Sequence, residues 1–291
     1  MAVTTSDIAA TAIAGHRSRG FLRRNPTVVI GLALLGLMVA MAVLAPWLGT
    51  VDPQALSPIR RLRHPSAQYW FGTDMLGRDV YSRVVYGARV SLIVGLAVAA
   101  FSTAVGLAIG LLTGFSRLAD ATIMRVMDGL MSIPAVLIAI ALMALSRASL
   151  QNVIFAITVA EVPRVTRLVR GVVLTLREQP FVEAATATGT PFLRTLWRHI
   201  LPNTLAPLLV QGTYICASAM ITEAILSFIG AGTPPNIPSW GNIMAEGRSL
   251  FQIAYYIVLA PGVFLSLTVL AVNLVGDGMR DALDPRLARR M

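Results

Sequence analysis

Three long segments without a charged residue limit how this chain can fold. They are Thr27–Val51, Val90–Ser116 and Ser249–Gly276. An α-helix rises about 1.5 Å per residue, so about 20 apolar residues cross the roughly 30 Å hydrocarbon core of a bilayer. Each segment is long enough for this, and we predict that each forms a membrane-spanning helix.

Three further segments are shorter or carry charges, and we predict that they also span the membrane. Gly129–Ser146 is uncharged but contains Pro134, and Asn203–Thr222 is followed at once by Glu223. Ala148–Ala160 is the weakest candidate, because it must extend past Glu161 towards Leu168 to cross the membrane. Only 13% of all residues are charged, against about 25% in a typical soluble domain. The sequence thus predicts an all-α integral membrane protein with six transmembrane helices.

The arginines indicate how these helices are oriented. All 24 basic residues are arginine. With a cytoplasmic N-terminus, the inner loops hold about twice as many of them as the outer loops, in agreement with the positive-inside rule. We therefore expect both termini in the cytoplasm. The first apolar run is too long for a signal-peptide core, which measures about 7–15 residues.

The composition also excludes several functions. The net charge of +10 suggests a nucleic-acid binder, but the arginines lie at the ends of apolar runs, so we expect no nucleic-acid partner. A chain without lysine cannot form the P-loop of an ATPase. The single Cys216 excludes an internal disulfide, and His16, His64 and His199 are too dispersed for a metal site. The sequence has neither an H-E-x-x-H nor a Gly-x-Ser-x-Gly motif, which argues against a hydrolase.

Asp52–Arg89 is the longest predicted loop outside the membrane. Its second half reads as a helix, with Asp74 as N-cap and Val80, Val84 and Val85 at helical spacing. The simplest interpretation is an interfacial helix whose arginines extend into water. We divide the chain into an N-terminal cytoplasmic segment, a first span with its outer loop, a five-span core and a cytoplasmic tail: residues 1–26, 27–89, 90–276 and 277–291.

A polar stretch, Glu183–Asn203, lies between the fourth and fifth predicted spans. Pro180 suits the first position of a short helix, and Gly189 suits its C-terminal stop. A helix of about nine residues is too short to be stable alone in water. One of its faces carries Phe181, Ala184, Ala185 and Thr188. We expect this face to dock on another surface.

A second short helix is predicted after Thr190, which can cap it. Leu196 and Ile200 share an apolar side with Trp197, and we expect this side to pack against the spans. Arg194 lies on the other side. The two helices could form a lever with one arm in the bundle and one arm presented to a soluble partner. An ordinary amphipathic loop is the alternative, and the residues alone favour neither.

At these residues the sequence resembles the ABC importer permeases. Their EAA signature reads here Glu183-Ala184-Ala185, then Gly189, then His199-Ile200-Leu201-Pro202, and only His199 departs from the general pattern. Residues 71–92, 226–244 and 276–286 resemble the DppC/OppC-type permeases of dipeptide, oligopeptide and nickel importers. The resemblance runs from Thr27 to Arg286.

The resemblance implies a type I ABC importer permease bundle in a bacterial cytoplasmic membrane. A homologous B-type permease would complete the translocation path, and two cytoplasmic ABC ATPase units, separate or fused, would bind beneath it. An extracytoplasmic binding protein would deliver the substrate. ATP and Mg would belong to the ATPases, with no cofactor on this chain. The loop 178–203 would hold the coupling helix, with ATPase contacts at Phe181, Glu183, Ala184, Ala185, Gly189 and Arg194.

Glu223 is the one carboxylate well inside a predicted span. Ionisable groups in membranes usually face a protein interior or water, so Glu223 is a candidate for lining the translocation path. Alternatively, it lies near the outer interface and pairs with an arginine such as Arg248. For the substrate we favour short peptides. Nickel, haem or another small solute carried by the same architecture is the alternative, as is a secondary transporter with Glu223 as its coupling group.

Overall fold

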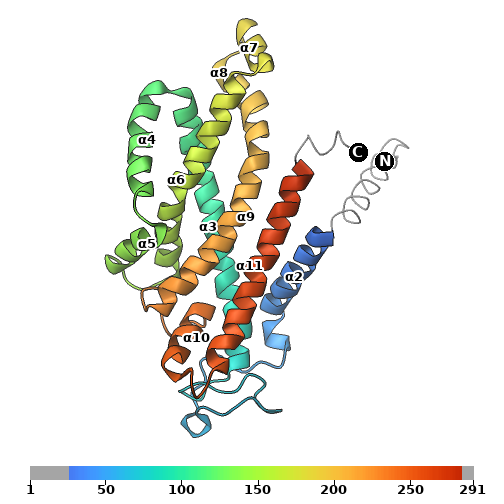
Figure 1. Cartoon of the computed structure of the whole chain (residues 1–291), viewed down its shortest axis with the longest axis vertical. Coiled ribbons are helices and arrows are strands. Elements are labelled where there is room, and N and C mark those ends of the chain that lie inside the picture. Colours follow the sequence, from blue (N-terminus) through green and yellow to red (C-terminus); the bar gives the residue numbers. More distant parts are fainter. Residues whose placement is uncertain (1–25, 284–291) are drawn as a thin grey trace, which may run out of the picture.

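The computed structural model describes residues 26–283, and this part consists of helices joined by loops (Figure 1). The segments 1–25 and 284–291, which we predicted to be cytoplasmic, lie outside the described residues. The long helices are α2 (Pro26–Val43), α3 (Val80–Phe115), α6 (Leu150–Arg177), α9 (Leu201–Phe228) and α11 (Tyr256–Leu283). The shorter helices are α4 (Arg117–Met131), α5 (Ala135–Ala144), α7 (Pro180–Ala187), α8 (Phe192–Thr195) and α10 (Trp240–Gly247).

Four helices of the described part are long and apolar enough to cross a membrane: Pro26–Val43, Val80–Phe115, Leu193–Phe228 and Tyr256–Ala282. Helices α4 and α5 together make a fifth candidate, although they are bent by 89°. The bend lies at Pro134, the N-cap of α5. Helix α6 is not among the candidates, because it carries charged residues along its second half. The count of six spans therefore stays a prediction.

Helices α3 and α6 form the most extensive contact between two elements of the described part. On α3, glycines recur every four residues and face a matching row of valines on α6: Gly106, Gly110, Gly114, Val165, Val169 and Val173. A Cβ atom on any of these glycines would lie 2.5–2.6 Å from a valine carbon. Small residues at this spacing allow two membrane helices to approach closely. The glycines of α3 thus set the distance to α6.

A second core lies between α2, α3, α9, α10 and α11. Trp240 at the start of α10 is fully buried, and its indole N–H donates to the carbonyl of Val84 at 3.0 Å. Val80, Val84 and Val85 are all buried, as the predicted apolar face of this region requires. Helix α10 therefore folds back against the start of α3.

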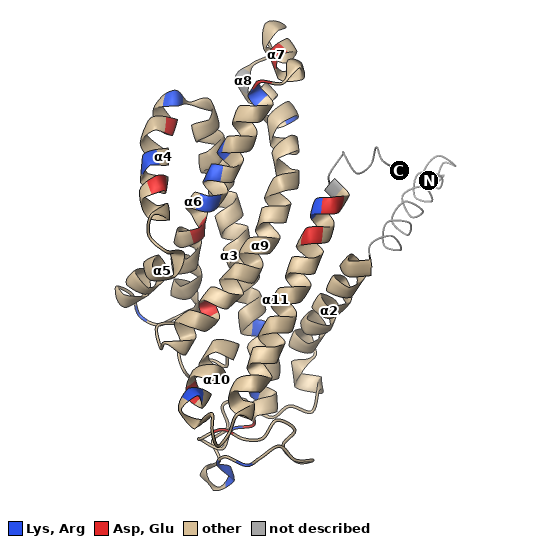
Figure 2. Cartoon of the chain, in the orientation of Figure 1, with Lys and Arg blue, Asp and Glu red and all other residues tan. Residues whose placement is uncertain are grey.

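The molecule has two distinct ends (Figure 1). Helices α7 and α8 form one end, while the loop before α3 and helix α10 form the other. The start of α2 and the end of α11 both point toward the α7 end. The charged residues of α4 and of the second half of α6 lie in the same half of the molecule (Figure 2). The structure thus has one end formed by α7 and α8 and another formed by α10 and the loop before α3.

Candidate functional site

The first candidate site is the short helix α7 and the turn that ends it. Pro180 occupies the first helical position, as predicted. Gly189 has a φ of +77° and donates its N–H to the carbonyl of Thr186, while Thr190 donates to the carbonyl of Ala185, both at 3.0 Å. This is a Schellman motif, in which a left-handed residue closes the helix. A Cβ at Gly189 would meet nothing within 4 Å, so the backbone conformation alone accounts for the glycine.

One buried side chain attaches α7 to the bundle. Val182 is only 5% exposed. With Phe115 and Arg177 it lines a hollow of ≈ 660 Å³ between α7 and the ends of α3 and α6. The sequence analysis did not single out Val182, because it considered the face of Phe181 and the alanines. The anchor is thus outside the predicted docking face, about 100° around the helix from Phe181.

The predicted docking face remains open. Phe181 is 43% exposed, and its ring lies 6.1 Å from the ring of His199, measured between centroids. Helix α7 contacts α8, so the two short helices form one surface. Ala185 is half-buried, and the other predicted contact residues are exposed: Phe181, Glu183, Ala184, Gly189 and Arg194. Glu183 also lines the hollow beside Val182. The structure therefore brings the six residues together at one end of the molecule.

The second short helix, which we predicted after Thr190, differs in part from the prediction. Ile200 is fully buried and Leu196 packs against the same core, as expected. Trp197, however, is 66% exposed, so its predicted packing against the spans is wrong. Leu196–Ile200 form a π-helical turn, which holds more residues than an α-helical turn and rotates the following side chains. Trp197 and Leu193, which is 64% exposed, add apolar surface next to α7.

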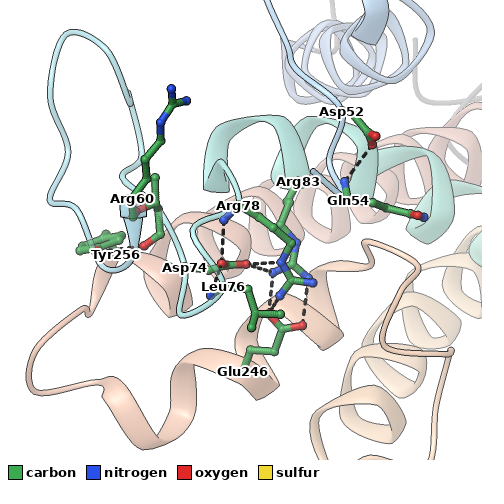
Figure 3. A network of polar contacts seen from close by, with 10 residues as sticks. Asp52, Gln54, Arg60, Asp74, Leu76, Arg78, Arg83, Glu246 and Tyr256 are labelled. Atoms are coloured by element: carbon green, nitrogen blue, oxygen red, sulfur yellow. Dashed lines mark hydrogen bonds and ion pairs between the residues drawn. The ribbon is translucent and has the colours of Figure 1, made fainter. Parts of the chain in front are cut away.

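At the opposite end, two arginines and two acids form a buried network (Figure 3). Asp74 Oδ2 accepts from Arg78 Nε and from Arg83 Nη1, both at 2.6 Å. Glu246 Oε2, from α10, accepts from Arg78 Nη2 and Arg83 Nη1, both at 2.5 Å. The side chains of Asp74 and Arg83 are each 1% exposed. We call these four residues the outer network; it ties the loop before α3 to α10.

The outer network corrects two expectations. Asp74 is not a helix N-cap: α3 begins at Val80, and the Asp79 carboxylate accepts the N–H of Ser82 at 2.8 Å. Arg83 does not extend into water, as an interfacial helix would require, but is almost completely buried. A guanidinium in this position needs paired carboxylates, because an unpaired buried charge is very costly.

Glu223 lies inside the chain, with no exposed surface. Its Oε1 accepts from Ser227 Oγ at 2.8 Å and from Thr233 Oγ1 at 3.4 Å, while its Oε2 has no partner among the described residues. Arg248, the alternative partner considered for Glu223, donates instead to the carbonyl of Phe228 at 3.1 Å. Glu223 thus stabilises the loop before α10 through hydrogen bonds, and its role in translocation stays a prediction. Across residues 26–283, no three His, Cys, Asp or Glu side chains are placed to hold a metal ion.

Known proteins match this chain along most of its length. The family described as binding-protein-dependent transport system inner membrane component matches residues 102–289, and the N-terminal transmembrane domain of oligopeptide transport permease C matches residues 17–65. A probable peptide ABC transporter permease of Sinorhizobium fredii is 52% identical over 100% of both chains. The dipeptide transport system permease DppC of Alkalihalophilus pseudofirmus is 41% identical over 91% of this chain and 88% of its own.

A solved structure shares the fold. An inward-facing conformation of the MetNI methionine ABC transporter aligns with a TM-score of 0.57 and 23% identity, covering 69% of this chain and 96% of that chain. The family match covers more than half of the chain, and the resemblance drawn from the EAA stretch is confirmed. The chain therefore belongs to the family of binding-protein-dependent transport system inner membrane components, the membrane permeases of ABC transporters.

Proposed function

We propose that this chain is the C-type permease of an importer of short peptides and that α7 is its coupling helix. The names of its relatives support the substrate class, since they include a dipeptide permease and a probable D,D-dipeptide permease of Escherichia coli, the latter 39% identical over 95% of this chain. A homologous B-type permease would complete the path. Two ATPase units would bind at the α7 end, and a binding protein would deliver peptides at the other end.

The way α7 is held carries this proposal. An eight-residue helix is too short to be stable on its own, and Val182 fixes it on one side only. The neighbouring side offers Phe181 and small alanines, which allow another backbone to come close. A groove on an ATPase would cover this side, and burying the 43% of Phe181 that is exposed would contribute about 0.6–1.3 kcal/mol. Exposed Trp197 and Leu193 would extend the contact.

The charge distribution supports a cytoplasmic location for the α7 end. Arginines of α4 and α6 lie in this half of the molecule (Figure 2), and cytoplasmic loops carry an excess of arginine and lysine. The chain has no lysine for a P-loop, so ATP would be bound and hydrolysed by the partner subunits. Their closure would move α7, and the two permeases would rock as rigid bodies between two access states.

Reversing the charge of Glu183 tests the coupling role. Glu183→Arg should lower uptake of a radiolabelled dipeptide by about tenfold or more, which corresponds to about 1.4 kcal/mol of lost coupling, and should weaken co-purification of the ATPase. Glu178→Arg is the matched control, because Glu178 is an exposed carboxylate at the end of α6 but outside α7. This control should transport normally.

The outcomes separate the two parts of the proposal. Wild-type uptake and ATPase binding by Glu183→Arg, at equal amounts in the membrane, would contradict the coupling role of α7. A wild-type transporter that takes up nickel but no peptide would contradict the substrate class alone. Uptake that survives depletion of ATP would contradict the importer mechanism.

A further inference from the structure

The exposed surfaces of the long helices differ in chemistry. On α3 the exposed large side chains are apolar and 43–61% exposed: Ile93, Leu96, Phe101, Val105 and Leu112. A surface of this kind suits lipid, since hydrocarbon cannot satisfy polar groups. Helix α9 runs between α6 and α11 and in front of α3 (Figure 1). Its exposed residues include the apolar side chains of Ile221, Ile225 and Phe228, but a polar stretch precedes them.

Helix α9 has two faces. Leu209 and Cys216 line an apolar hollow of ≈ 410 Å³ that α9 shares with α2, α3 and α11. At a helical spacing of three and four residues, a polar row lies on the opposite face and is partly exposed: Gln211, Tyr214 and Ser218. The same helix therefore presents an apolar side to α3, while the side away from α3 is polar from Gln211 to Ser218 and apolar at Ile221, Ile225 and Phe228.

Polar contacts continue this row onto the neighbouring helices. Ser218 Oγ donates to Glu161 Oε1 of α6 at 3.5 Å, and Glu161 Oε2 pairs with Arg164 Nη1 at 3.0 Å. On the other side, the Tyr214 hydroxyl donates to Asp277 Oδ1 of α11 at 2.6 Å. We call these five residues the polar track. It crosses α6, α9 and α11 on one face of the molecule.

We propose that the polar track is the wall that this chain contributes to the translocation path. The inference rests on the proposed function, because it assigns a place on this chain to the translocation path of such a permease. Charged groups at the end of a membrane bundle face water or protein rather than lipid, and the Arg164 side chain is 52% exposed. A wall with a guanidinium, two carboxylates and two hydroxyls suits a solute with charges of both signs, as a short peptide has. Glu223 is fully buried and contributes nothing to this surface.

Thiol labelling of the assembled transporter in inside-out membrane vesicles tests the assignment. Cys216 is the only cysteine of the chain, so Cys216→Ala gives a parent into which single cysteines can be placed. Gln211→Cys and Ser218→Cys report on the polar face. Leu209→Cys is the matched control, because Leu209 is 54% exposed on the same helix but on the apolar face. The probe is a membrane-impermeant sulfonate-bearing methanethiosulfonate, which reacts with the thiolate in water.

We expect Gln211→Cys and Ser218→Cys to react at least about tenfold faster than Leu209→Cys, because only a thiol in water ionises readily. Addition of ATP with vanadate should change the rates on the polar face and leave the control unchanged. Equal rates on both faces, faster labelling of Leu209→Cys, or no labelling of the polar face in any nucleotide state would overturn the assignment. Dipeptide uptake by the Cys216→Ala parent is measured in parallel. Loss of peptide transport would count against the proposed function and not against the assignment of the polar face to the translocation path.

Discussion

Replacing Arg83 by methionine tests whether the outer network holds the loop before α3 in place. Methionine fills much of the same volume but removes the guanidinium. Asp74, 1% exposed, would then have Arg78 as its remaining ion-pair partner, and so would Glu246. Removing one partner of a buried ion pair costs about 3–5 kcal/mol. We expect a cost of about 3 kcal/mol, at the lower end of this range, because the Glu246 side chain is 28% exposed and reaches water.

The single cysteine provides the assay. Cys216 is 6% exposed, so a thiol-reactive fluorophore labels it only when the purified chain unfolds in detergent. In a chain of this size, 1 kcal/mol shifts the melting temperature by about 2–4 °C. Arg83→Met should therefore melt about 6–12 °C below the wild type.

Two further variants show whether the pairing is responsible. Arg61 lies in the same loop and is exposed, so Arg61→Met should change the stability by less than about 0.5 kcal/mol. Adding Glu246→Gln to Arg83→Met balances the remaining charges and should restore part of the lost stability. The reasoning fails if Arg83→Met melts within about 2 °C of the wild type, a shift of less than 1 kcal/mol.

Two other predictions concern helix packing and the buried carboxylate. Gly110→Ala would place a Cβ 2.6 Å from Val169 and should destabilise the chain by about 1–3 kcal/mol. Gly36→Ala, with nothing within 4 Å, should be neutral or slightly stabilising; equal melting temperatures for the two variants would contradict the close approach. Glu223→Ala removes the acceptor for Ser227 and should cost about 2–4 kcal/mol in the same thermal assay. Glu223→Gln retains an acceptor and should lose less than half as much, so equal losses would argue against this hydrogen bond.

Local signals in the sequence were sufficient to predict α7. Pro180 and Gly189 fix its two ends through backbone geometry that does not depend on the rest of the fold. Val182 as the anchor did not follow, since which side of α7 meets the bundle depends on the path of the chain after α6.

The outer network could not be predicted from local patterns. Arg78 and Glu246 are separated by 168 positions in the sequence, so their pairing depends on α10 folding back against α3. Without Glu246, the arginines beside Asp74 read as exposed residues of an interfacial helix. The same limit applies to Trp197, because a π-helical turn leaves no clear signature in the residue pattern.

The glycine row of α3 is a different case, since its signal is in the sequence. The residues "GLAIGLLTG", from 106 to 114, repeat glycine at every fourth position, which is typical of close contacts between membrane helices. The sequence analysis found the apolar run and did not use this spacing. The identity of the partner, α6, still depends on the fold.

The position of α7 connects the coupling surface to the polar track. Glu178 and Gln179 join α6 to α7, and on the other side Leu193–Phe228 form one helix of 36 residues. These two helices carry four of the five residues of the polar track. A displacement of α7 would therefore be transmitted to these four residues through the stiff helical backbone. The glycine and valine rows hold α6 against α3 at van der Waals contact, and close-packed interfaces switch between discrete arrangements rather than stretch. We therefore expect α3 and α6 to tilt together as one rigid body. This motion would change how far the polar track is open to water, while the exposed apolar side chains of α3 would stay in lipid.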